Sequence, residues 1–326
     1  MKESTSIKGT LIGVGNVGAK YDLSETDLVG SRTHLKALQR NDKIDQIHIV
    51  DPDVANLKNL ANAPKVCGLS SQLSEVNLSS TESIVTIAAP SSSHTKLLVE
   101  LNGQDFPCRN IICEKPLAYS LADIRELQKL PGSFTKKIIV NYSRTWSNDH
   151  QQVLQIAKEN DLGKLLYISG VYDKGMVNNG VHLIDYLWGI LDGKPEVLWC
   201  GNPIFDSDSS PTVSLNARIK DVPIYIVGND ARNYSRFEIH LFFKEGSISL
   251  TDSGRKISIL KPQTHPEYQG YQILNPSSER ETDLNCSLDK LLQEITEDQA
   301  VSNFKRSLEV EEFCLEIASK NYHGEG

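Results

Sequence analysis

The segment GTLIGVGNVG, residues 9–18, carries the clearest sign of architecture in this chain. An apolar run ends at Ile12, and Gly13, Gly15 and Gly18 follow with the spacing G-x-G-x-x-G. In this pattern the first glycine makes a tight turn, the second lets the backbone approach a pyrophosphate, and the third lets a helix pack closely on the strand. Glycines also mark ordinary strand-to-helix turns, so the motif by itself is weak evidence for a ligand.

A second strand pattern, residues 44–50, ends at Asp51, where a carboxylate would meet the hydroxyl groups of an adenosine ribose. No arginine follows to bind a 2'-phosphate, which favours NAD over NADP as the cofactor. The interval from Gly18 to Asp51 exceeds the usual ~20 residues, because residues 21–32 look like an insertion before the helix resumes at Thr33. This insertion is either a flap near the cofactor or a plain surface loop.

Strand and helix patterns alternate from residue 8 to residue 143, which indicates a parallel sheet covered on both faces, with right-handed crossovers. The predicted fold class is therefore α/β, beginning with an N-terminal Rossmann sheet. Further strands are expected at residues 83–89, 110–113 and 137–142, and helices at residues 94–101 and 120–129.

After Trp146 the regular alternation of strand and helix patterns ends. Residues 195–260 are rich in β-branched residues and in the Gly, Pro, Asn and Asp residues that favour turns. We expect a C-terminal α+β domain with a large, mostly antiparallel open sheet, covered by helices on one face. The predicted domains are residues 1–143 and 144–326, with a last helix that can pack back on the Rossmann domain. Remaining expectations in this region are helices at 151–159 and 181–190, a strand at 164–172, and polar loops at 206–211 and 262–280.

Bulk properties exclude several classes of function. The chain has 326 residues, 39% hydrophobic and 23% charged, with a net charge of −8, which argues against nucleic-acid binding. No run approaches the ~18 apolar residues that a membrane span needs. The polar N-terminus does not read as a signal peptide, so we expect a cytoplasmic protein. Six cysteines without metal-ligand spacing read as reduced core residues, and the eight histidines form no ligand pair, so no metal is expected.

Lys115 lies in the segment Glu114-Lys115-Pro116, directly after the apolar strand at residues 110–113. Its amine is therefore expected at the carboxyl end of a strand, where open α/β sheets bind ligands. There it would act as a proton carrier or a substrate clamp; otherwise it is a surface lysine. Ala89, Pro90 and His94 follow the neighbouring strand and would line the nicotinamide side of the cofactor, unless they form only a capping turn.

A second candidate cluster lies at residues 178–185, Asn-Asn-Gly-Val-His-Leu-Ile-Asp. His182 and Asp185 are three residues apart on one helical face, so the carboxylate could orient the imidazole. Gly180 would allow the close approach of a substrate or of nicotinamide. A histidine at the start of an apolar helix is more often a packing residue, and its functional role depends on the cofactor.

Together these segments resemble the Gfo/Idh/MocA family (glucose-fructose oxidoreductase, inositol dehydrogenase, rhizopine catabolism). The order and rough spacing of the motifs match along nearly the whole chain. The matching stretches are Gly13–Gly18, Asp51–Asp53, Ala88–Pro90 with His94, Glu114–Leu117 and Gly180–Asp185.

The resemblance implies a Rossmann domain and an open-sheet domain with NAD(H) or NADP(H) between them. It also implies an oxidoreductase that acts on a carbinol group of a sugar, cyclitol or nucleotide sugar. By this resemblance Lys115 lies near the reacting oxygen, in a Lys-Pro bond that is often cis, and His182 serves as acid/base or as its partner. The expected cofactor-binding residues are Gly13, Gly15, Asn16, Val17, Gly18, Asp51, Ala89, Pro90, His94 and Glu114.

One position departs from the family pattern, because Asn178 stands where many members have an aspartate that completes a proton relay. An amide cannot exchange a proton near neutral pH, so Asn178 is expected to bind a substrate hydroxyl. A subgroup of the family that resembles proteins of surface-carbohydrate synthesis shares the Tyr-x-Lys-Gly…Asn-Gly-x-His pattern. The other substrate-binding candidates are Lys174, Arg144 and Asp185.

The rival interpretation is a non-catalytic regulator on the same fold, binding a dinucleotide or a sugar. Asn178 is the residue that keeps this alternative open. The family usually pairs through the exposed face of the second sheet, so a homodimer or homotetramer is expected, and an apolar outward face between Tyr225 and Phe243 would fit this.

Overall fold

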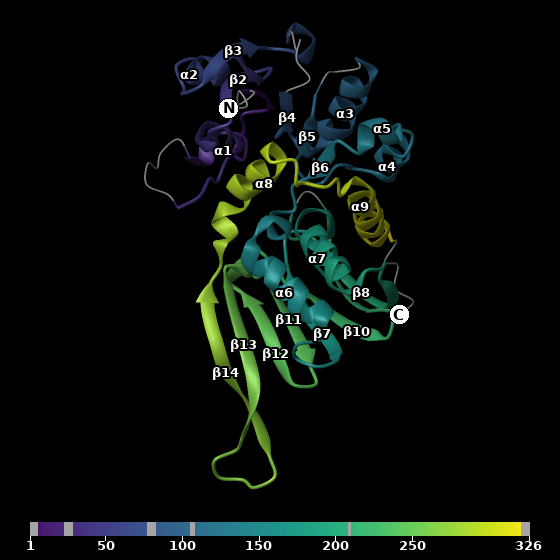
Figure 1. The fold of residues 1–326 in the computed structure, drawn as a ribbon. Helices are drawn as coiled ribbons and strands as arrows, with labels where there is room; N and C mark the ends of the chain where they lie inside the picture. Colours follow the sequence, from purple (N-terminus) through teal and green to yellow (C-terminus); the bar gives the residue numbers. More distant parts are fainter. Residues whose placement is uncertain (1–5, 23–28, 77–82, 105–107, 208–209, 321–326) are drawn as a thin grey trace. The chain divides into compact units, whose positions relative to one another are not determined.

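The computed structural model of the chain describes residues 6–22, 29–76, 83–104, 108–207 and 210–320. The chain forms two compact units (Figure 1). Unit 1 contains residues 1–146 and 285–308, and unit 2 contains residues 147–284 and 309–326. The predicted α/β fold class, with one parallel and one mostly antiparallel sheet, is confirmed.

Unit 1 is built on a six-stranded parallel sheet in the order β3-β2-β1-β4-β5-β6. Its central strands are nearly continuous apolar runs, as expected where both faces of a sheet are covered; all five residues of β4 are buried. The strands are β1 (Ile7–Ile12), β2 (Ile44–Val50), β3 (Val66–Ser70), β4 (Ser83–Ile87), β5 (Asn110–Cys113) and β6 (Ile138–Val140). The helices are α1 (His34–Arg40), α2 (Val54–Leu60), α3 (His94–Gly103), α4 (Leu121–Leu127), α5 (Gly132–Thr135) and α8 (Ser287–Thr296).

Residues 285–308 belong to unit 1, although the sequence analysis placed them in the second domain. The reason is the apolar face of α8, where Leu288, Leu291 and Ile295 join the buried core around β1 and β2. The next helix, α9 (Phe304–Ser319), begins in unit 1 and ends in unit 2. Just before α9, the Asn303 side chain bonds both backbone groups of Val140 and so covers the edge of β6.

Unit 2 is built on an eight-stranded sheet in the order β14-β13-β12-β11-β7-β10-β9-β8. Only the β7–β10 pair is parallel among these neighbours. Helices α6 (Asn148–Glu159) and α7 (Val181–Leu191) lie on one face (Figure 1), where Leu183 of α7 packs over Gly170. The strands are β7 (Leu165–Tyr172), β8 (Glu196–Ile204), β9 (Thr212–Ile219), β10 (Val222–Gly228), β11 (Glu238–Phe243), β12 (Gly246–Thr251), β13 (Lys256–Thr264) and β14 (Gln272–Glu281).

Two local predictions were wrong. Residues 262–280, expected as a polar loop, form most of the long β13–β14 hairpin. Both faces of its outer part are exposed, so no alternation of apolar residues marks it as a strand. The edge strand β3 was not predicted, because it is five residues long, contains Gly68 and buries fully only Ser70.

Candidate functional site

The three glycines of the loop in unit 1 differ in the space around their Cα atoms. Gly13 has φ +88°, and a Cβ there would come within 2.6 Å of the Ala89 backbone. A Cβ on Gly18 would overlap the carbonyl oxygen of Gly13. A Cβ on Gly15, by contrast, would meet no heavy atom of the described structure within 4 Å. Gly15 therefore leaves the loop backbone open on one side, as close approach of a pyrophosphate requires.

The glycine loop makes backbone hydrogen bonds to the chain on both sides of the predicted insertion. The Ala19 amide donates to the Gly15 carbonyl at 2.9 Å, which closes a turn. After the insertion, the amides of His34 and Leu35 donate to the carbonyls of Val17 and Gly18 at 3.1 and 2.9 Å. The amides at the start of this turn are backbone donors of the kind that bind anions.

Asp22 joins the two ends of the predicted insertion. Its carboxylate accepts hydrogen bonds from the Arg32 and Thr33 amides and the Thr33 hydroxyl. Residues 23–28 lie outside the described residues. The end of the insertion is attached to α8, because the amide and hydroxyl of Ser31 donate to Asp289 at 2.8 and 2.6 Å. This attachment fixes the point where α1 restarts.

Asp51 follows β2 and lies directly beside the glycine loop. Its Oδ2 atom accepts a hydrogen bond from the Val14 amide at 2.9 Å, and its Oδ1 atom accepts from the Asp53 amide at 2.9 Å. The Asn56 side chain, which the sequence analysis did not single out, donates to Oδ1 at 3.3 Å. The carboxylate predicted to meet a ribose therefore also joins the end of β2 to the loop.

Lys115 follows β5, and the Lys115–Pro116 peptide bond is cis. The Glu114 Oε1 atom is 2.7 Å from the His34 Nε2 atom and accepts a hydrogen bond from the Asn141 side chain at 2.7 Å. Burial alone would raise the pKa of Glu114, but these contacts and the neighbouring charge of Lys115 hold its pKa below the usual range. Glu114 is thus an anion with partners inside the protein, and its contact with a cofactor stays a prediction.

His94 is buried in the first turn of α3 and faces two backbone carbonyls. Its Nδ1 atom is 2.6 Å from the Pro116 oxygen, and its Nε2 atom is 2.8 Å from the Ala89 oxygen. The Thr95 hydroxyl donates to the Leu117 oxygen at 3.1 Å. His94 therefore fastens the segment after β4 to the segment after β5, and its predicted contact with the cofactor is untested.

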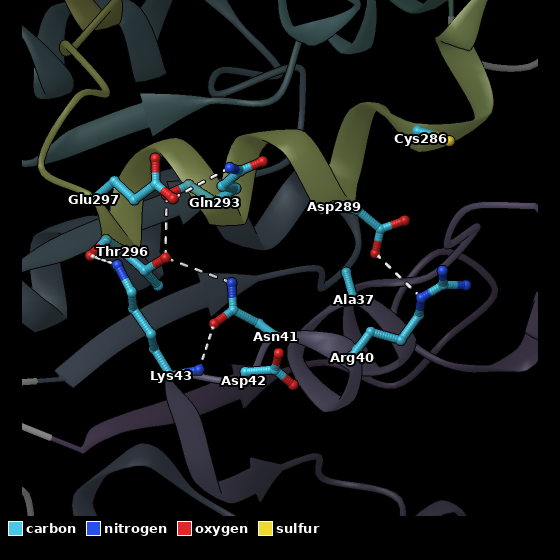
Figure 2. A pocket seen from close by; sticks show the side chains of 10 residues that line it. All are labelled: Ala37, Arg40, Asn41, Asp42, Lys43, Cys286, Asp289, Gln293, Thr296 and Glu297. Carbon is cyan, nitrogen blue, oxygen red and sulfur yellow. Dashed lines mark hydrogen bonds and ion pairs between the residues drawn. The ribbon is translucent and has the colours of Figure 1, made fainter. Parts of the chain in front are cut away.

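A pocket of unit 1 lies elsewhere, between α1 and α8 (Figure 2), and contains none of the predicted site residues. Its two cations already have partners: the Lys43 amine donates to the Thr296 oxygen at 3.2 Å, and the Arg40 Nε atom lies 3.8 Å from Asp289. Both cations of this pocket therefore already contact groups of the protein itself.

In unit 2 the predicted residues gather where β7 ends and α7 begins. A π-helical turn, Met176–Gly180, carries Asn178 and leads into α7, which places the half-buried His182 and the buried Asp185 on its first turns. Such π-turns are often found at functional sites. Lys174, exposed and in a left-handed conformation with φ +59°, precedes this turn.

Asp173, which the sequence analysis did not consider as a site residue, joins the π-helical turn to the segment before β11. Its buried carboxylate accepts hydrogen bonds from the Asn179 side chain at 3.1 Å, the Ser235 hydroxyl at 3.3 Å and the Arg236 amide. A carboxylate directly after an apolar strand pattern is the sequence signal that could have identified it.

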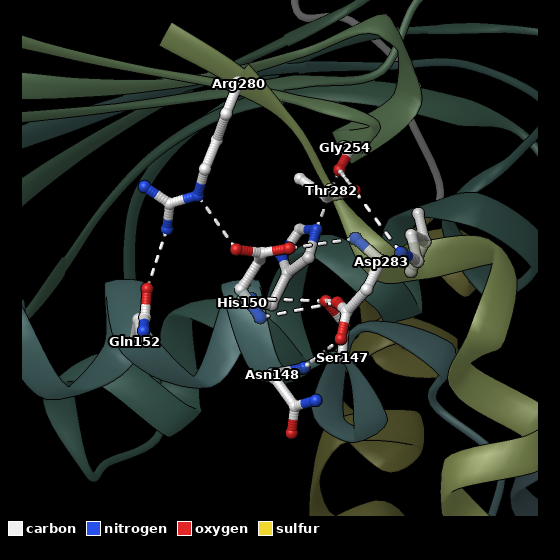
Figure 3. Close-up of polar contacts among 10 residues, drawn as sticks. Ser147, Asn148, His150, Gln152, Gly254, Arg280, Thr282 and Asp283 are labelled. Carbon is white, nitrogen blue, oxygen red and sulfur yellow. Dashed lines mark hydrogen bonds and ion pairs between the residues drawn. The ribbon is translucent and has the colours of Figure 1, made fainter. Parts of the chain in front are cut away.

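A further polar cluster of unit 2 joins the start of α6 to the segment that follows β14 (Figure 3). The Asp283 carboxylate caps the start of α6, accepting bonds from the Ser147 hydroxyl and the amides of Asn148 and Asp149. Asp149 in turn accepts from the Asp283 amide and from Arg280. Burial opposes ionisation of Asp283, but the donors at the cap hold its pKa below the usual range.

The predicted residues thus form one group in each unit. In unit 1, the glycine loop, Asp51, Ala89, Pro90 and Lys115 share the carboxyl edge of the parallel sheet. In unit 2, Lys174, Asn178, His182 and Asp185 share the β7–α7 junction. Arg144, expected to bind substrate, is buried in the 3-10 turn Ser143–Trp146 of unit 1.

The described residues contain no cluster of three or more His, Cys, Asp or Glu side chains arranged to hold a metal ion. None of the helices in the same ranges is both long enough and apolar enough to cross a membrane.

Comparison with known proteins agrees with this architecture. A family model described as "Oxidoreductase family, NAD-binding Rossmann fold" matches residues 8–142. A search of curated proteins gave no match.

Three solved structures illustrate the similarity of fold. A dehydrogenase from Chromobacterium violaceum is 15% identical with a TM-score of 0.73, over 97% of this chain and 95% of that one. A myo-inositol dehydrogenase from Corynebacterium glutamicum is 15% identical with a TM-score of 0.68, over 96% of each chain. An oxidoreductase from Agrobacterium radiobacter, in complex with NAD+, L-tartaric acid and magnesium, is 15% identical with a TM-score of 0.69, over 95% of this chain and 94% of that one.

Proposed function

Because residues 8–142 belong to the Gfo/Idh/MocA family of oxidoreductases with an NAD-binding Rossmann fold, we propose that this protein is an NAD-dependent dehydrogenase or reductase. Its proposed substrate is a secondary alcohol or ketone of a sugar, a cyclitol or a nucleotide sugar, and the subgroup pattern favours a compound of surface-carbohydrate metabolism. The observation that carries this proposal is the shared sheet edge, where the open side of Gly15, the Asp51 carboxylate and Lys115 follow β1, β2 and β5.

The residues of unit 1 fit a dinucleotide. The first-turn amides after Gly15 would bind the pyrophosphate, and Asp51 would accept hydrogen bonds from the ribose hydroxyls. A 2'-phosphate would face the Asp51 carboxylate, which is the reason for proposing NAD rather than NADP. When bound, the nicotinamide ring would accept or supply the hydride.

The proton is assigned to the protein's own side chains. Lys115 and His182 are proposed to converge on the reacting oxygen and to take its proton during oxidation of the alcohol. During reduction, the lysine ammonium would polarise the carbonyl and protonate the developing oxyanion. Asn178, Lys174, Arg144 and Asp185 are proposed to bind and orient the substrate or the histidine.

The proposal is tested by NADH binding and by turnover of NAD+ with a panel of sugars, cyclitols and nucleotide sugars. General acid/base help contributes about 10²–10⁴ in rate, so Lys115→Ala and His182→Ala should each lose at least about a hundredfold in turnover while still binding NADH. Lys129→Ala, which removes an exposed lysine of the same unit, should change neither quantity. Turnover near that of the wild type in either site variant would remove that residue from the mechanism.

A second candidate function is a regulator that binds a dinucleotide or a sugar without catalysis. Asn178 favours it, because the amide replaces an acidic member of the proton relay that the family resemblance implies. Tight NADH binding, together with no turnover of any compound in the panel, would support the regulator over the enzyme.

We also infer that the protein associates with itself through the open face of the second sheet. Tyr167, Tyr225 and Phe242 lie close together on strands of this sheet, with the Tyr167 and Phe242 rings stacked at 4.3 Å and the Tyr167 and Tyr225 rings edge to face at 6.4 Å. Tyr167 and Tyr225 are 39% and 47% exposed. An exposed aromatic cluster on a flat sheet is typical of an interface between subunits.

A further inference from the structure

We propose that His34, Glu114 and Asn141 form a buried positioning network, the Glu114 network, that sets the location and charge environment of the Lys115 amine and links it to the glycine loop. The proposal builds on the role given above to Lys115. It concerns residues of unit 1 alone.

The Glu114 network brings together three segments that are distant in the sequence. His34 begins α1, Glu114 follows β5 and Asn141 follows β6. Both polar neighbours meet the same oxygen of Glu114 at 2.7 Å, and the side chains of His34 and Glu114 are only 2% and 13% exposed. Two short hydrogen bonds to one atom hold the carboxylate far more firmly than a single flexible contact would.

A negative charge fixed at this place acts on the next residue. A buried carboxylate is costly unless it is paired, and here the partners and the Lys115 charge together keep Glu114 ionised. The interaction is mutual, because an anion that is stabilised by a neighbouring ammonium also stabilises that ammonium. The network therefore acts on the protonation of Lys115 as well as on its position.

The backbone after Lys115 is held from the opposite side. His94 contacts the Pro116 oxygen, and Thr95 donates to the Leu117 oxygen, both from the first turn of α3. With Glu114 fixed before it and Pro116 fixed after it, the backbone of Lys115 has little freedom to move. A catalytic group whose supporting residues are locked in this way is held near its productive geometry.

His34 also connects the network to the cofactor loop. Its backbone amide donates to the Val17 oxygen at 3.1 Å, while its ring contacts Glu114 at 2.7 Å. One residue therefore joins the turn proposed to bind pyrophosphate to the carboxylate beside Lys115. We accordingly assign His34, Glu114 and Asn141 as positioning residues, which act on the reaction through Lys115 and the glycine loop.

The test measures the reactivity of Lys115 without any substrate. Trace labelling of amines with acetic anhydride between pH 6 and 10, followed by mass spectrometry, gives the labelling rate and apparent pKa of each lysine. Glu114→Gln keeps the shape of the side chain and removes its charge. It should lower the apparent pKa of Lys115 and raise its labelling rate at pH 8 about three- to tenfold, the size expected for the loss of a nearby opposite charge. Lys129 serves as the internal reference.

Two further variants separate positioning from folding. Loss of the ring in His34→Ala should change the labelling profile of Lys115, and His34→Gln, whose amide can donate from nearly the same place as Nε2, should restore it. Glu126→Gln, which removes an exposed charge on α4, is the matched control and should leave Lys115 unchanged. Circular dichroism and thermal unfolding report whether each variant folds, and the pair His34→Ala and His34→Gln supplies the comparison if Glu114→Gln does not fold.

The outcomes distinguish this proposal from the proposed function. An unchanged Lys115 profile in folded Glu114→Gln and His34→Ala proteins would overturn the network even if the enzyme turns over a sugar. A shifted profile with rescue by His34→Gln would support the network even if no compound of the panel reacts.

Discussion

Gly15→Ala is expected to weaken NADH binding while leaving the fold intact. A methyl group at this position meets no heavy atom of the described structure within 4 Å, and Gly15 is not among the residues with positive φ. The change in the free energy of unfolding should therefore stay within ~0.5 kcal/mol, as for most surface substitutions. The same methyl group would occupy the space through which a pyrophosphate approaches the loop.

The loss of affinity can be estimated from the cost of crowding a well-packed contact, about 1–3 kcal/mol. This range corresponds to an increase of about 5- to 150-fold in the dissociation constant of NADH, because ~1.4 kcal/mol is tenfold. Fluorescence titration of NADH measures the affinity, and thermal unfolding followed by circular dichroism measures the stability.

Gly18→Ala is the matched control within the same loop. Its methyl group would overlap the Gly13 carbonyl oxygen and lie 2.9 Å from the Val14 Cα atom, so the backbone would have to move. This variant should unfold at a clearly lower temperature, whereas Gly15→Ala should not. If Gly15→Ala binds NADH as tightly as the wild type, the pyrophosphate does not approach the loop at this residue, and the assignment of the site is refuted.

Two further predictions concern unit 2. Asp283→Asn should lower the free energy of unfolding by about 1 kcal/mol at pH 6, as for the loss of a helix cap. Hydrogen bonds from the cap lower the pKa of Asp283 in the folded protein. The stability that its carboxylate contributes is therefore present above the usual carboxyl pKa and is lost as the pH falls through the folded-state pKa. The difference in melting temperature between wild type and Asp283→Asn should accordingly shrink from pH 6 to pH 3, and a constant difference would contradict this account. Phe242→Lys should lower the oligomeric state measured by analytical ultracentrifugation. Gln155→Lys, on the exposed side of α6, should leave it unchanged. An unchanged sedimentation coefficient for Phe242→Lys would exclude the open face of the second sheet as the interface.

Local sequence patterns were sufficient to predict five of the six strands of the Rossmann sheet and the need for glycine at positions 13 and 18. Both depend on interactions within a few residues of the chain or on the simple need to bury an apolar run. The insertion before Thr33 stays a prediction, and the amides of His34 and Leu35 after it donate to the glycine loop.

The partners of Glu114 could not be predicted in this way. Its oxygen meets His34, 80 residues earlier, and Asn141, 27 residues later. A buried polar contact across such separations leaves no periodic trace in the sequence, and only the order of the parallel strands brings the three residues together. The same holds for His94, whose two carbonyl partners belong to different strand ends.

Residue chemistry and spacing were thus enough to identify a Rossmann sheet, a glycine loop and a lysine at the end of a strand, because each is written in a short segment. Tertiary structure alone decided that α8 returns to the first unit, that residues 262–280 pair as a hairpin, and that the predicted cofactor ligands Glu114 and His94 have partners within the protein. The physical reason is that the sequence shows only the kind of contact a group requires. A buried polar group requires a hydrogen-bond partner, and an amphipathic helix requires an apolar surface. Which distant segment supplies that contact is settled only when the chain packs.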